Sequence, residues 1–109
     1  MIRQLFIFIL LISTNVNTKA QTFVWAKSLG GTNSDYSASI TIDGTGNVYT
    51  TGYFLGTADF NPGAGTANLT ATGQSDIYIS KLDANGTFLW AKRIGGNSWD
   101  DASGIKFDA

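Results

Sequence analysis

The chain has 109 residues, of which 43% are hydrophobic and 14% charged, with 13 glycines, one proline and neither cysteine nor histidine. This balance excludes a disordered chain and suits a compact, glycine-rich β domain. Without cysteine or histidine, these residues cannot form disulfides or the Ser-His and Cys-His pairs of nucleophilic catalysis.

Residues 1–20 are predicted to be a secretory signal peptide. The positive Arg3 precedes the unbroken apolar run Leu5–Ile12, and Thr18 and Ala20 supply small residues before a cut after position 20. A membrane anchor is the alternative, but the run is shorter than the ~20 residues that a spanning helix needs. We therefore expect a secreted or cell-surface protein with no membrane span after cleavage.

Cleavage would leave residues 21–109 with five basic and eight acidic residues, a net charge of −3, because Arg3 and Lys19 are removed. All eight acids are aspartates, which favours positions in turns, where a short side chain bonds to the backbone two residues on. With no basic patch, a nucleic-acid partner is not expected.

Alternation of apolar and polar residues predicts strands along most of the mature chain. The expected strands are Thr22–Leu29, Ala38–Asp43, Val48–Phe54, Asp76–Leu82, Thr87–Ile94 and Ala102–Asp108. Gly30-Gly31 is expected to break the first strand, and tight turns are expected at 44–47 and 83–86. Residues 55–75 are expected to form a long loop with one short irregular strand at Ala67–Ala71. No helical period follows the signal peptide, which excludes parallel βαβ architectures.

The segment Phe23–Gly31, FVWAKSLGG, returns as Phe88–Gly96, FLWAKRIGG, at an offset of 65 residues. Nine of the 21 positions from Phe23 to Asp43 are identical to their counterparts 65 residues on. Self-similarity at a fixed period indicates a repeat protein, in which each unit buries its apolar face against the next and about three or more units are needed. Four consecutive antiparallel strands, Ala38 to Ile94, describe one blade of a β-propeller.

These residues resemble the SBBP-type β-propeller repeat of secreted bacterial proteins. The matching words are DGTGNVYTTGYF (Asp43–Phe54), DIYISKLDANGTFLWAKRIGG (Asp76–Gly96) and DASGIKFDA (Asp101–Ala109). The TADFNPGAGTANLT insertion, Thr57–Thr70, is similar to a variant common in that family. The resemblance covers residues 23–109 and implies a propeller of about seven blades, often within larger exported proteins that carry adhesive or sorting domains. It implies no defined activity, because a fold does not fix a function.

The expected fold is therefore all-β but incomplete, with one full antiparallel blade, the outer strand of another and the inner strand of a third. Thr22–Leu29 matches the outermost strand of a blade, so in a complete propeller it would finish the final blade and close the ring. The missing inner strands would then lie beyond Ala109. We expect further blades of the same protein as partners, supplied by a longer chain or by association.

Asp59 and Asn61 are the candidate metal ligands, because they place two oxygen-bearing side chains two residues apart in a Gly-rich loop similar to calcium loops. Turn formation is the alternative, since no third acid is near and Pro62 interrupts the pattern. Asp35 and the pair Asp100-Asp101 could be acid-base carboxylates. Asp35 and Asp100 occupy equivalent repeat positions, however, so hydrogen bonds in turns or caps are the favoured interpretation.

Three tryptophans are candidates for packing or binding. Trp25 and Trp90 occupy matching repeat positions and are expected to pack between blades. Trp99 replaces Ser34 in an inter-strand loop, where an exposed ring could stack on a surface glycan or a protein. Partial burial against a neighbouring blade is the alternative for Trp99.

We expect a non-enzymatic structural or interaction module, part of an exported β-propeller that displays a binding surface, with no cofactor. Two alternatives stay open. The first is the propeller portion of a secreted carbohydrate-active enzyme whose catalytic residues lie outside this chain. The second is a calcium-stabilised adhesion module.

Overall fold

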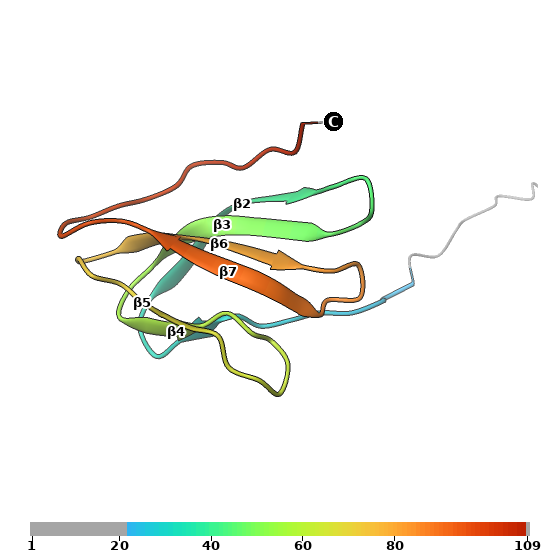
Figure 1. The fold of residues 1–109 in the computed structure, drawn as a ribbon, viewed down its shortest axis with the longest axis horizontal. Coiled ribbons are helices and arrows are strands. Elements are labelled where there is room, and N and C mark those ends of the chain that lie inside the picture. The colour runs from blue at the N-terminus through green and yellow to red at the C-terminus, as the bar shows by residue number, and fades with distance from the viewer. Residues whose placement is uncertain (1–21, 109) are drawn as a thin grey trace, which may run out of the picture.

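The computed structural model describes residues 22–108, which form two antiparallel β-sheets (Figure 1). The strands are β1 (Gly30–Gly31), β2 (Asp35–Ile42), β3 (Val48–Phe54), β4 (Thr57–Asp59), β5 (Asn68–Thr70), β6 (Asp76–Leu82) and β7 (Phe88–Ile94). The predicted signal peptide, residues 1–20, lies outside the described residues. Between residues 22 and 108, no helix is long and apolar enough to cross a membrane.

The larger sheet has the order β2-β3-β6-β7, with every neighbouring pair antiparallel. This is the blade that the sequence predicts, with β2 beginning at Asp35 rather than Ala38. Because side chains alternate along a strand, the sheet has two faces of different character. We call one the core face, with Ile40, Thr50, Tyr78 and Leu82. The other is the Trp90 face, with Thr41, Tyr49, Ile79 and Trp90.

The two hairpins of the blade close through the same aspartate-centred turn. The Asp43 carboxylate accepts hydrogen bonds from the backbone N–H groups of Thr45 and Asn47, both at 3.0 Å. The Asp83 carboxylate likewise accepts the N–H groups of Asn85 and Thr87, at 2.8 and 2.9 Å. Each turn needs one residue with positive φ, which Gly46 (85°) and Gly86 (79°) provide.

The smaller sheet has the order β1-β4-β5 and is built mostly from the insertion at residues 55–75. Its strand β5 falls inside the predicted irregular strand Ala67–Ala71, whereas β4 was not expected. The prediction that Gly30-Gly31 breaks a strand is wrong, because the pair is itself β1 and pairs with β4. A side chain at Gly31 would clash with the carbonyl oxygen of Thr57, so glycine permits this close backbone approach.

The core lies between the smaller sheet and the core face of the blade. Its buried residues are Phe54, Ala58, Phe60 and Tyr78, with Leu29, Leu69, Ala71, Phe88 and Ala91 packed partly buried around them. The Phe54 and Phe60 rings meet edge to face with centroids 5.3 Å apart, and each also contacts the Tyr78 ring. Stacking the inserted strands on the blade therefore supplies the burial that one isolated sheet lacks.

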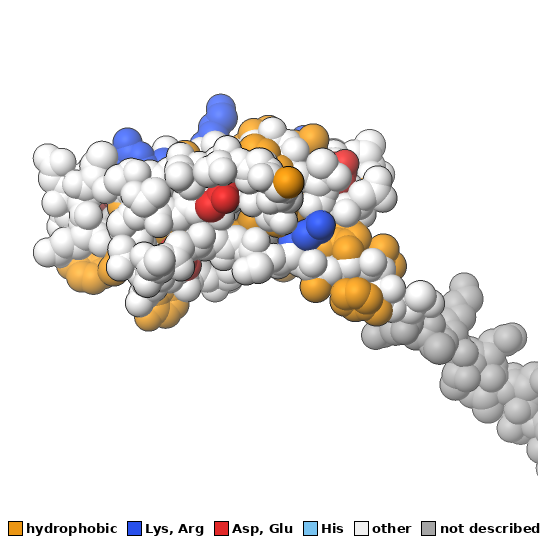
Figure 2. Space-filling model, turned by 90° about the horizontal axis from the view of Figure 1, so that it is seen from below, with side chains coloured by type: hydrophobic (Ala, Val, Ile, Leu, Met, Phe, Trp, Pro, Cys, Tyr) orange, Lys and Arg blue, Asp and Glu red, His pale blue; other side chains and the backbone are white. Residues whose placement is uncertain are grey.

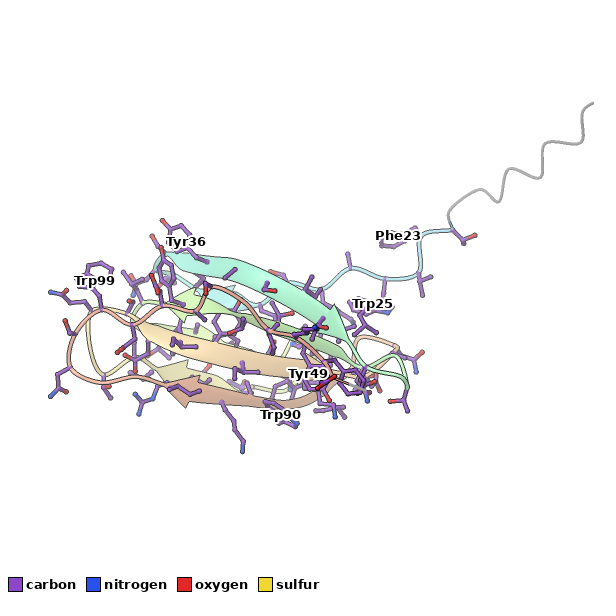
Figure 3. The ribbon with its side chains drawn as sticks, turned by 90° about the horizontal axis from the view of Figure 1, so that it is seen from above. Phe23, Trp25, Tyr36, Tyr49, Trp90 and Trp99 are labelled. Carbon is purple, nitrogen blue, oxygen red and sulfur yellow. The ribbon has the colours of Figure 1, made fainter. Side chains whose placement is uncertain are left out.

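Two predicted strands, Thr22–Leu29 and Ala102–Asp108, are wrong: both segments are extended but neither belongs to a sheet. A strand requires a neighbouring backbone for its ladder, and neither segment has one among residues 22–108. The first runs along the core face and the second runs back over the Trp90 face toward the hairpins (Figures 1 and 3). Both segments thus contact the blade without a backbone ladder, through hydrogen bonds that each involve a side chain.

Candidate interaction surfaces

The Trp90 face holds the segment Ala102–Asp108 above a cavity of about 290 Å³. The cavity is lined by Thr41, Tyr49, Ile79 and Trp90 from the blade and by Ile105, Lys106 and Phe107 from the segment. Two long hydrogen bonds anchor the segment on β2. Ser39 Oγ donates to the Ile105 carbonyl at 3.5 Å, and the Phe107 N–H donates to Thr41 Oγ1 at 3.3 Å.

The core face carries a second cavity, of about 420 Å³, between the sheet and residues 25–30. Trp25 closes its hairpin end, where the indole Nε1–H donates to the Ala84 carbonyl at 2.9 Å. Ile40 lines the same cavity but remains 65% exposed, and the neighbouring Ile42 is 59% exposed. Apolar side chains also gather beside the first described residues, as Figure 2 shows, where Phe23 and Val24 lie exposed.

The two cavities repeat one arrangement at the sequence offset of 65 residues. Trp25 shares a cavity with Ile40, and its counterpart Trp90 shares the other cavity with Ile105, the counterpart of Ile40. Each tryptophan therefore lies where a blade meets a copied segment. This placement agrees with the predicted role of Trp25 and Trp90 in packing between blades.

Asp35 and Asp100 make the same hydrogen bond in both copies of the repeat. The Asp35 carboxylate accepts the Gly31 N–H, and the Asp100 carboxylate accepts the Gly96 N–H, each at 2.8 Å. Each aspartate thus closes the loop that begins at the second glycine of the Gly-Gly pair, which lies four residues earlier in the chain. This confirms that the aspartates recur for a structural reason.

Asp59 and Asn61, the candidate calcium ligands, both bind the backbone of their own loop. Asp59 Oδ1 accepts the N–H groups of Asn61 at 2.9 Å and Ala67 at 2.8 Å, and Asn61 Oδ1 accepts the Gly63 N–H at 2.8 Å. The bonds from Ala67 and Asn61 hold the pKa of Asp59 below its usual value. Among residues 22–108, no group of three or more aspartate, glutamate, histidine or cysteine side chains could hold a metal ion. Calcium binding here stays a prediction.

Trp99 lies in the loop after β7 and is 64% exposed, as expected from the sequence. The backbone beside it is held by the strand-like pairing of Ser75 with Trp99, and the Asp100 N–H donates to the Ser75 carbonyl at 3.0 Å. Figure 3 shows Trp99 and Tyr36 toward one end of the sheet, with Trp25 and Tyr49 toward the other. We call this first end, with its loops 32–34, 71–75 and 95–100, the loop end.

A second aromatic feature at the loop end, the stacked pair Tyr36 and Tyr53, was not predicted from the sequence. Their ring centroids are 4.6 Å apart with an interplanar angle of 24°. Burial, followed by the neighbouring Tyr36 and Asp101, raises the pKa of Tyr53 above its usual value. Counting residues from the hairpin turn would place Tyr36 opposite Phe54. The β-bulge between Ser37 and Ser39 shifts its partner to Tyr53, so only the register reveals the pair.

A four-stranded antiparallel sheet, with copied segments lying over both of its faces, is the blade of a β-propeller. The model of the SBBP family, described as a beta-propeller repeat, matches residues 24–53. The chain therefore carries an SBBP-type β-propeller repeat.

The chain is also similar to the uncharacterized WD repeat-containing protein L264 of Acanthamoeba polyphaga mimivirus. The two are 35% identical over 101 residues, which span 78% of this chain and 7% of the relative. The chain thus covers a small part of the length of the curated relative that it matches. That relative is viral, so the bacterial source implied by the resemblance stays a prediction. No solved structure matches this chain significantly.

Proposed function

We propose that this chain is a non-enzymatic interaction module of an exported β-propeller, and that its loop end binds a surface glycan through Trp99. The exposure of Trp99 in a loop fixed to the blade carries the proposal. Loops held by a rigid scaffold often carry binding residues, and tryptophan is enriched among the residues that contribute most to binding. The flat indole ring offers an apolar surface to the C–H groups of a sugar ring.

The loop that carries Trp99 is preorganised, which supports a binding role. The Gln74 N–H donates to the Ser98 carbonyl at 3.1 Å, and Ser75 Oγ donates to the Asp100 carbonyl at 3.0 Å. Bonds on both sides of Trp99 therefore hold its backbone before any ligand arrives. Less conformational entropy is then lost on binding, which increases the affinity that one ring can provide.

Tyr36 extends the aromatic surface at the loop end. It is 51% exposed and is supported from behind by its stack on Tyr53. Aromatic rings with a polar hydroxyl suit a ligand that presents both C–H faces and hydroxyl groups. The non-enzymatic part of the proposal is supported by Asp35, Asp59 and Asp100, whose carboxylates accept hydrogen bonds from their own loops.

A glycan array probed with the chain tests the proposal. We expect binding to at least one glycan, and a loss of about ten-fold or more in affinity for Trp99→Ala, since an aromatic anchor contributes more than about 1.4 kcal/mol. Phe23→Ala is the control, because this ring is also exposed, at 78%, but lies beyond the opposite end of the sheet. Binding that Trp99→Ala leaves unchanged, or a silent array, would remove the glycan from the proposal.

Export is tested separately by expressing the chain with its own first twenty residues in a secreting bacterium. We expect the protein outside the cytoplasm, with Gln21 as its N-terminal residue. An uncleaved protein retained in the cells would contradict the exported part of the proposal while leaving the binding part open to the array.

A further inference from the structure

The first strand of the blade presents an apolar ridge that the described residues leave largely uncovered. Ile40 and Ile42 project from β2 on the core face, and both are more exposed than apolar strand residues usually are. The partner strand β3 and the cavity residues of segment 25–30 cover only one flank of this ridge. An edge strand with two exposed isoleucines is a surface that favours association.

The chain itself shows what such a ridge packs against. Ile105 and Phe107 are the repeat counterparts of Ile40 and Ile42, and both lie on the Trp90 face. There they meet the apolar side chains of Tyr49, Ile79 and Trp90. Segment Ala102–Asp108, which is the repeat counterpart of part of β2, thus already packs on the Trp90 face of the blade.

The core face repeats the same contact in part. Trp25 stands beside Ile40 in the position that Trp90 holds beside Ile105. A cavity of about 420 Å³ lies beside Ile40 on this face, with room for further apolar side chains.

We propose that two copies of this chain associate head to tail, with the Ile40-Ile42 ridge of one copy seated on the Trp90 face of the other. The contact is heterologous, because the ridge and the face are different surfaces of the same molecule. The pair therefore keeps one free ridge, on one copy, and one free face, on the other, so association continues to a closed ring or an open chain. The proposal needs only the blade and does not depend on glycan binding.

Both surfaces are partly covered within each copy, which sets the strength of the association. Segment Ala102–Asp108 occupies the Trp90 face but is held by two hydrogen bonds of 3.3 and 3.5 Å and forms no strand. A segment in the same chain competes at a high effective concentration. The second copy must displace this segment. Polar replacements of Ile105 and Phe107 should therefore strengthen association, whereas charged replacements of Ile40 and Ile42 should weaken it.

Sedimentation velocity over a range of concentrations tests these opposite effects. For Ile105→Ser with Phe107→Ser we expect association at least about ten-fold tighter than for the unaltered chain, since apolar contacts of the competing segment are lost. For Ile40→Lys with Ile42→Lys we expect association at least about ten-fold weaker, because two charges would enter an apolar contact. Leu89→Lys is the matched control, since Leu89 is 46% exposed on the opposite edge strand.

A mixing experiment tests the head-to-tail geometry. The Ile40→Lys, Ile42→Lys chain keeps an intact Trp90 face, and a Trp90→Ser chain keeps an intact ridge, so their mixture should form a one-to-one dimer and nothing larger. Thr41→Lys replaces Trp90→Ser if circular dichroism shows that the latter unfolds. A monomeric Ile105→Ser, Phe107→Ser chain at every concentration, ridge variants that associate normally, or a mixture without heterodimer would each overturn the proposal.

Discussion

Replacing Phe54 by alanine is the most direct test of the two-sheet core. Phe54 is completely buried and lies at the end of β3, where its ring contacts both Phe60 of the insertion and Tyr78 of the blade. Burial of such a ring contributes about 1.5–3 kcal/mol, and its aromatic contacts add about 0.5–1.5 kcal/mol each. With the cavity left behind, we expect Phe54→Ala to lower the free energy of unfolding by about 3–5 kcal/mol.

The measurement is urea denaturation followed by tryptophan fluorescence, with linear extrapolation to water. Small domains have only about 5–15 kcal/mol of stability, so Phe54→Leu serves as a milder variant, with an expected loss of about 1–2 kcal/mol. Phe23→Ala, an exposed ring, should change stability by less than about 0.5 kcal/mol. If Phe54→Ala and Phe23→Ala behaved alike, the insertion would not be packed on the blade as described.

Three further predictions concern the turns and the buried charge. Side-chain and backbone hydrogen bonds in its turn lower the pKa of Asp43, so the stability it adds should be present above about pH 4 and lost as the pH falls below. Asp43→Asn should therefore destabilise at pH 7, and acid titration of both proteins should close the gap; a constant gap would contradict this. Thermal unfolding should show that Gly46→Ala, at positive φ, costs about 1–2 kcal/mol, while Gly44→Ala, with open space around it, costs less than about 0.5. Arg93→Met should cost about 1–3 kcal/mol in urea, because it removes the ion-pair partner of the buried Asp76 carboxylate; a loss below about 0.5 would show that backbone donors suffice.

The blade and its turns could be predicted because their causes are local. The alternation in Val48–Phe54 and Asp76–Leu82 reproduces β3 and β6 with the predicted bounds. The Asp-x-x-Gly turns supply a carboxylate for two backbone donors and a glycine for positive φ within a few residues. Repetition at 65 residues also predicted that Asp35 and Asp100 share a structural role. Each accepts a hydrogen bond from a backbone N–H four residues earlier, which needs no distant partner.

The candidate sites were predicted less completely, because they depend on register and packing. The exposure of Trp99 followed from its place in a loop, but the Tyr36-Tyr53 stack depends on a bulge that shifts the pairing by one residue. No local sequence pattern in β2 predicts that bulge. The sequence also offers Asp59 and Asn61 as oxygen ligands without showing that both already bind their own loop.

By itself, the amino-acid sequence determined the hairpins, the four-stranded blade and the repeat, because alternation and turn chemistry act over a few residues. Only the tertiary structure decided whether the two outer segments join a sheet. Thr22–Leu29 and Ala102–Asp108 alternate as strands do, yet they lie over opposite faces of the blade without joining a sheet. A strand is defined by the backbone beside it, and that neighbour is a property of the fold rather than of the segment.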